Sequence, residues 1–223
     1  MQTLSASKTK QESGFTMVEF VLSAMILLLI SAALFSIMAE SQRSSSYQTE
    51  VHAVLDNTRI AMDTVEGYIR QASNNPCTIG GFAGVVITAN PATSVQLRSD
   101  LTGSARCATS SCACVETNAA LRDQGDPDGR TDATGEDVTI SYDSTARTVS
   151  ITPAGGTAQP IANYISAFTL QYYNATGTEI PTGPGANVQK IKITMTGTTV
   201  LLHPQTRKTF AQTVTSDVQI ATR

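Results

Sequence analysis

Residues 11–38 read QESGFTMVEFVLSAMILLLISAALFSIM, and this stretch decides how the N-terminal part of the chain folds. One carboxylate, Glu19, stands directly before the uncharged apolar run 20–38. As a helix, this run would be about 28 Å long at roughly 1.5 Å per residue, close to the apolar thickness of a bilayer. A helix satisfies its own backbone hydrogen bonds, so the run predicts a single helix that spans a lipid bilayer.

The residues before the run carry Lys8 and Lys10. Basic residues favour the cytoplasmic side, so we expect a cytoplasmic leader and a globular part outside the cytoplasm. An ordinary secretory signal peptide would have a shorter apolar core, followed by a small-residue cleavage site. A plain single-pass anchor, with Glu19 at the membrane interface, is a second alternative.

The residues around Glu19 form a specific short signal. The sequence GFTMVE from Gly14 to Glu19, before a long apolar run, resembles the N-terminal signal of type IV pilins and pseudopilins. This match covers the N-terminal sixth of the chain. The resemblance implies that a prepilin peptidase cuts after Gly14 and that the new terminus, Phe15, is N-methylated. It also implies that Glu19 guides assembly with other pilins or pseudopilins at an inner-membrane assembly platform.

Glu19 needs a partner, because ionised groups in membrane helices are costly and rare. Cleavage after Gly14 would create an α-amine on Phe15 with a pKa of about 7.7–8 before methylation. Phe15 and Glu19 are i and i+4 on one helical face, so the two charges could pair within one chain. In the family the pair is thought to form with a neighbouring subunit, and both arrangements stay open.

The helical pattern continues beyond the apolar run as an amphipathic stripe. Its members are Val51, Leu55, Thr58, Met62, Val65, Ile69 and Ala72. The sequence Asn74-Asn75-Pro76 ends the pattern, because proline disfavours helix at the residue before it. We therefore expect a leader at 1–14 and a helix from Phe15 to about Ser73. The first half of this helix lies in segment 15–43 and the second half in segment 44–76. An exported β-rich domain at 77–223 follows.

Short β-type runs between turn signals follow Pro76. They cover residues 84–88, 94–98, 138–143, 148–152, 165–173, 190–195 and 210–221. Residues 199–202 are expected to continue the strand at 190–195. A long helix followed by antiparallel strands predicts an α+β fold, with the helix packed on an antiparallel β-sheet. This is also the pilin-like roll. The segments 56–63, 136–142 and 165–173 further resemble minor pilins of the PilW type, and 56–63 also resembles the J-type pseudopilin of type II secretion.

Four cysteines, Cys77, Cys107, Cys112 and Cys114, all follow the apolar run. An even number in an exported domain predicts two disulfides. Three connectivities are possible, and a bond between Cys112 and Cys114 would be strained. The alternative of a zinc or iron–sulfur cluster is less favoured, because the spacing fits no common site.

An acidic segment, DQGDPDGRTD at residues 123–132, resembles part of a calcium-binding loop. Asp126, Asp128 and Asp132 could supply the closely spaced oxygens that Ca²⁺ prefers. A plain acidic surface loop is the alternative. No other cofactor is indicated.

Other chemistry finds little support in the sequence. The two histidines, His52 and His203, lie far apart, and there is no Gly-x-Ser-x-Gly, His-Glu-x-x-His or phosphate-binding glycine motif. The net charge of −3 does not demand a nucleic-acid partner. A basic surface is an alternative if the strands that carry the basic residues are neighbours. It would consist of Lys190, Lys192, Arg207 and Lys208.

The resulting expectation is a structural subunit without enzymatic activity, a minor type IV pilin that helps to initiate or cap a pilus. It would lie in the inner membrane and then in the pilus or pseudopilus. A type II secretion pseudopilin is the first alternative. A membrane-anchored binding or adhesin module, one able to contact DNA, is the alternative from another class.

Overall fold

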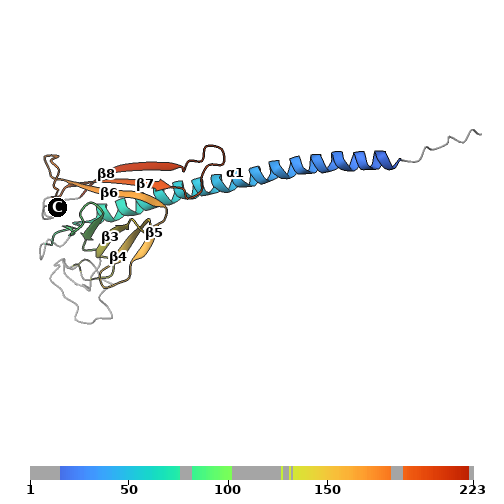
Figure 1. Cartoon of the computed structure of the whole chain (residues 1–223). Coiled ribbons are helices and arrows are strands. Elements are labelled where there is room, and N and C mark those ends of the chain that lie inside the picture. Colours follow the sequence, from blue (N-terminus) through green and yellow to red (C-terminus); the bar gives the residue numbers. More distant parts are fainter. Residues whose placement is uncertain are drawn as a thin grey trace, which may run out of the picture. The chain divides into compact units, whose positions relative to one another are not determined.

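The computed structural model describes residues 16–75, 82–101, 127, 131, 133–181 and 188–220. The chain divides into two compact units, Met1–Ser46 and Tyr47–Arg223. Helix α1, Met17–Gln71, begins in the first unit and ends in the second (Figure 1). The expected α+β arrangement is confirmed, with one long N-terminal apolar helix and antiparallel sheets.

The length of α1 follows from its composition. The helix contains no proline, and its single glycine, Gly67, lies in the penultimate turn. It ends at Gln71, and Ser73 takes a positive φ of 65°. The backbone N–H of Ser73 then donates to the carbonyl oxygen of Arg98 at 2.9 Å, which ties the helix end to a strand. The predicted end near Ser73 is therefore confirmed.

In the part of the chain that the structure describes, eight strands follow the helix and form two antiparallel sheets. Their bounds are β1 Val85–Ile87, β2 Ser94–Arg98, β3 Asp137–Asp143, β4 Thr148–Pro153, β5 Gln159–Ala162, β6 Ile165–Tyr173, β7 Lys190–Thr198 and β8 Ala211–Gln219. The first five strands form a sheet in the order β1-β2-β3-β4-β5, and the last three form a sheet in the order β6-β7-β8. Consecutive strands are hydrogen-bonded neighbours within each sheet, as short connections favour.

Several predicted strands match the structure closely. The expected hairpin is β3–β4, and Asp143 caps its turn by accepting hydrogen bonds from the N–H groups of Thr145 and Ala146 at 2.7 and 3.0 Å. The run 165–173 is β6. In β7, the odd-numbered positions from Ile191 to Gly197 are buried and alternate with half-buried neighbours, as the pattern predicts.

The strands form two sheets where one was expected, and two strand assignments also differ from the sequence-based expectation. Residues 199–202 do not continue β7, because the carboxylate of Glu50 binds two of their N–H groups and turns the backbone away. Strand β5 was not expected, since it contains Pro160. A proline is tolerated there because β5 is an edge strand in the described part of the sheet.

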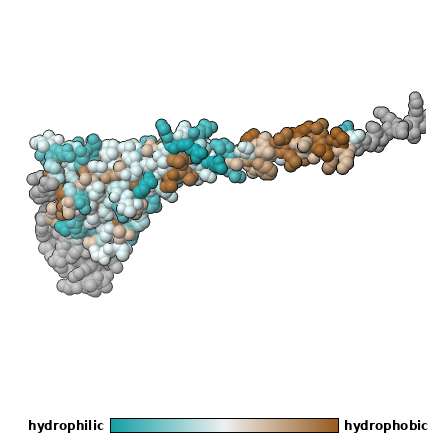
Figure 2. Space-filling model, in the orientation of Figure 1, coloured by the Kyte–Doolittle hydropathy of each residue, from teal (hydrophilic) through white to brown (hydrophobic). Residues whose placement is uncertain are grey.

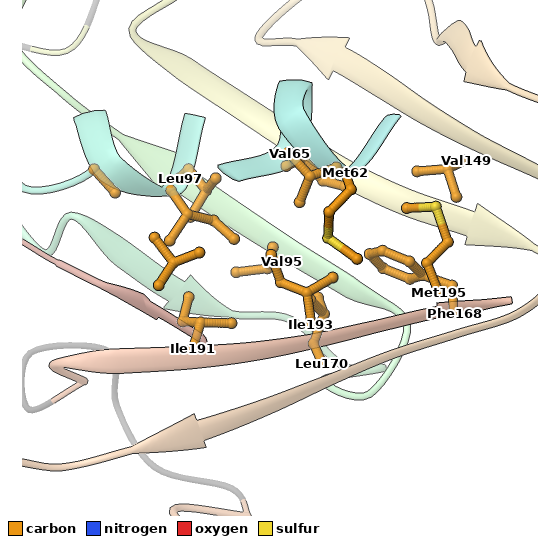
Figure 3. Close-up of a cluster of buried hydrophobic side chains, with 14 of the residues drawn as sticks. Met62, Val65, Val95, Leu97, Val149, Phe168, Leu170, Ile191, Ile193 and Met195 are labelled. Carbon is orange, nitrogen blue, oxygen red and sulfur yellow. The ribbon is translucent and has the colours of Figure 1, made fainter. Parts of the chain in front are cut away.

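The core of the second unit lies between α1 and the two sheets (Figure 3). Met62 and Val65 of α1 meet side chains from β2, β4, β6 and β7. These are Val95, Leu97, Val149, Phe168, Leu170, Ile191, Ile193 and Met195. Each of these side chains is at most 3% exposed, so the contacts remove a large apolar area from water.

The N-terminal end of the expected stripe is shifted. Val54 is buried, at 1% exposed, whereas Val51 and Leu55 are half-buried. The reason is a close approach of α1 to β7 at Gly197. A Cβ atom there would lie 2.8 Å from Cγ1 of Val54 and would collide with Oγ1 of Thr58. Thr58 itself is buried and donates a hydrogen bond to the carbonyl oxygen of Val54 at 2.7 Å.

Two buried polar groups are satisfied within the second unit. The Tyr172 hydroxyl donates to the carbonyl oxygen of Pro91 at 2.8 Å, and burial raises its pKa. The Glu136 carboxylate, in a residue only 1% exposed, accepts hydrogen bonds from the N–H groups of Leu101 at 2.8 Å and Ala133 at 3.1 Å. Glu136 thus fastens the chain on both sides of the segment 102–132.

Candidate membrane and assembly segment

The start of α1 is a reciprocal capping arrangement between Thr16 and Glu19. The Oε2 atom of Glu19 accepts hydrogen bonds from the N–H and the hydroxyl of Thr16, both at 3.0 Å. In return, the Glu19 N–H donates to Oγ1 of Thr16 at 3.3 Å. This is the Ser/Thr-x-x-Glu capping box, which satisfies N–H groups that a helix start leaves without partners.

The cap leaves part of Glu19 available. Within the described residues, both hydrogen bonds that its carboxylate accepts fall on Oε2. Oε1 can therefore receive another donor without disturbing the start of the helix. The negative charge also lies in the first turn of α1, where the helix dipole favours an anion.

Figure 2 shows the apolar run that follows as a continuous hydrophobic surface, and no part of it is buried among the described residues. Its large side chains are strongly exposed, for example Phe20 at 66%, Leu29 at 73% and Phe35 at 72%. Ser31 donates its hydroxyl to the Leu27 carbonyl oxygen at 2.8 Å, so this polar group does not oppose burial in an apolar medium. Of the helices that the structure describes, this one is long and apolar enough to cross a membrane.

A second exposed apolar surface lies in the second unit, on the loop 199–210 between β7 and β8. Val200, Leu201 and Leu202 are 59%, 47% and 49% exposed. We call these three residues the apolar tip. The Glu50 carboxylate accepts hydrogen bonds from the N–H groups of Val200 at 2.6 Å and Leu201 at 2.9 Å, so the tip is fastened to α1.

Most of the other predicted site residues fall outside the described ranges. These are Gly14, Phe15, Cys77, Cys107, Cys112, Cys114, Asp126, Asp128 and Asp132. Cleavage, disulfides and calcium binding therefore remain predictions from the sequence. In the part of the chain with assigned positions, no three His, Cys, Asp or Glu side chains gather in a way that could hold a metal ion.

The four basic residues considered for one surface lie at opposite ends of β7. Lys190 and Lys192 pair in register with Gln219 and Asp217, and Lys190 Nζ lies 3.7 Å from Oδ2 of Asp217. Arg207 and Lys208 are exposed on the loop beyond the other end of the strand. Nine strand residues correspond to about 26 Å between the ends, so the four side chains do not form one patch.

The two histidines have different surroundings, although His203 contacts α1 only five positions before His52. His52 is exposed on α1. His203 lies in the β7–β8 loop, where its ring meets the Tyr47 ring edge-on at a centroid distance of 5.1 Å. Its Nδ1 accepts hydrogen bonds from the N–H groups of Gln205 and Thr206, both at 3.2 Å, so it supports the loop.

The sequence analysis missed two contacts, the capping box and the contact of Glu50 with the loop. The capping box could have been predicted, because Thr16 and Glu19 have the required spacing just before an apolar run. The contact of Glu50 with the loop had no local signal, because its partners lie 150 and 151 positions away.

Comparison with models of known protein families gives no match to this chain, and comparison with curated protein sequences gives none either.

Proposed function

We propose that the chain is a minor subunit of a type IV pilus, anchored by the first part of α1 and assembled through Glu19. The observation that carries this proposal is the exposed apolar run headed by one carboxylate with an available oxygen. Such a surface needs a cover, because contiguous apolar surface of this size is unfavourable in water. Lipid would cover it in the membrane, and other subunits would cover it in a filament.

The second unit suits the role of a rigid exported domain. Its core is continuous across both sheets and the second half of α1. The resemblance of GFTMVE to the pilin signal supports the finer assignment, in which Glu19 pairs with the amine of a neighbouring subunit. Both groups would then be neutralised in a low-dielectric environment, where an unpaired charge is strongly disfavoured.

The geometry allows the assembly role of Glu19 to be separated from its capping role. Glu19→Gln keeps an oxygen for the cap, since Gln also serves at this position, but removes the charge. Thr16→Ala removes the capping hydroxyl and keeps the charge. We expect Glu19→Gln to lose piliation at a normal protein level, and Thr16→Ala to retain it. The reverse result would assign Glu19 to the helix start alone.

Processing and assembly type need separate measurements. Mass spectrometry of the mature protein should show a chain that starts at N-methylated Phe15, and Gly14→Val should retain the leader. In a deletion strain, loss of surface pili supports the proposal, whereas loss of protein secretion identifies a type II secretion pseudopilin. Intact pili and secretion, together with binding of the purified protein to DNA or surfaces, would point to a binding module.

A further inference from the structure

The apolar tip is an ordered surface rather than a loose end of the loop. Besides the two bonds to Glu50, the Thr199 hydroxyl donates to the Leu201 carbonyl oxygen at 3.1 Å and accepts from the Phe210 N–H at 2.9 Å. Across the loop, the His203 N–H donates to the Lys208 carbonyl oxygen at 2.8 Å. The N–H groups of Val200 and Leu201 are thus paired while the three adjacent apolar side chains are exposed.

We propose that the apolar tip inserts into the surface of the bilayer that holds the chain, as a second membrane contact. This inference rests on membrane anchoring by the apolar run of α1. Glu50, which holds the tip, follows the end of that run by only twelve positions in the sequence. A loop this close in sequence to a membrane span is held at high effective concentration near lipid, so a weak contact is sufficient.

The size and charge of the loop favour lipid over a protein partner. A stable protein interface covers about 800 Å² on each side, far more than three side chains provide. Membrane insertion has no such threshold, because its strength scales with the apolar area that is buried and adds to an existing anchor. Arg207 and Lys208 are exposed on the same loop, and their charges complement anionic headgroups.

The chain has no tryptophan, so one introduced residue gives an unambiguous fluorescence signal. Leu201→Trp keeps an apolar side chain at the tip and the N–H that binds Glu50. Ala175→Trp is the matched control, because Ala175 is exposed in the turn after β6, at the opposite end of β7. Each full-length variant is reconstituted into phosphatidylcholine vesicles, with or without phosphatidylglycerol, that carry brominated acyl chains.

We expect the emission of Trp at position 201 to shift to the blue and to be quenched by brominated lipid, more strongly with phosphatidylglycerol. The control should show neither change. Equal quenching at both positions, or none at position 201, would overturn the inference. A blue shift without quenching that grows with protein density would show contact with a second copy, and would also overturn it. Flotation of the same vesicles tests the anchor separately, since protein that fails to float refutes membrane anchoring itself.

Discussion

The close approach of α1 to β7 makes Gly197→Ala the most informative single substitution in the second unit. The new methyl group would collide with Oγ1 of Thr58 and lie 2.8 Å from Cγ1 of Val54. Overpacking of a well-packed core typically costs about 1–3 kcal/mol. Replacing glycine by alanine also returns about 0.4–1 kcal/mol through the unfolded chain, so we expect a net loss of unfolding free energy of about 1–2 kcal/mol.

The assay is thermal unfolding of the full chain in detergent, followed by circular dichroism. For a protein of this size the loss corresponds to a decrease in Tm of about 2–8 °C. Gly67→Ala is the control, because Gly67 lies on α1, the helix that approaches Gly197. An added Cβ at Gly67 has nothing within 4 Å, so this substitution should raise Tm. Thr58→Ala removes the colliding oxygen, so it should cost less in the Gly197→Ala background than alone. If Gly197→Ala is neutral or stabilising, the argument from close approach is wrong.

Three other outcomes are expected in the second unit. Burial raises the pKa of Tyr172, so above about pH 10 the hydroxyl keeps its proton in the folded state and loses it in the unfolded state. The free energy of unfolding should therefore fall there by up to about 1.4 kcal/mol per pH unit. In denaturant titrations at several pH values, Tyr172→Phe should show a smaller fall than the unmodified chain. Glu136→Ala leaves two backbone N–H groups without their acceptor and should lower the unfolding free energy by about 2–4 kcal/mol, and a midpoint within error of the unmodified chain would contradict the anchoring role. Glu50→Ala should speed hydrogen exchange at the N–H groups of Val200 and Leu201, and unchanged exchange would show that the carboxylate does not hold the loop.

Local patterns predicted much of the fold. The stripe from Thr58 onward and the alternation in β7 follow from periods of 3.6 and 2, and the apolar run follows from its length and uniform composition. Strand β5 escaped prediction because Pro160 argues against a strand unless the strand lies at an edge. The division into two sheets escaped as well, because strand pairing is a long-range property that no single run encodes.

The candidate sites also divide into one that a local pattern predicts and one that depends on long-range contacts. Glu19 stood out because a lone charge before an apolar run is costly without a partner, and a local argument could find it. The apolar tip could not be found locally, because Val200 and Leu201 read as a strand continuation until Glu50 is known to bind their N–H groups. The burial of Val54 in place of Leu55 likewise depends on where Gly197 allows the sheet to approach.

The capping box bears on the order in which α1 folds and the leader is removed. Both of its residues, Thr16 and Glu19, follow the predicted cleavage point after Gly14. A peptidase that removes the leader would therefore leave Thr16, Glu19 and the capped start of α1 intact. Maturation would change the charge carried at the N-terminus without refolding it. In the proposed pathway, the unprocessed chain would therefore wait in the membrane with the capped helix already formed, and cleavage would serve assembly rather than folding.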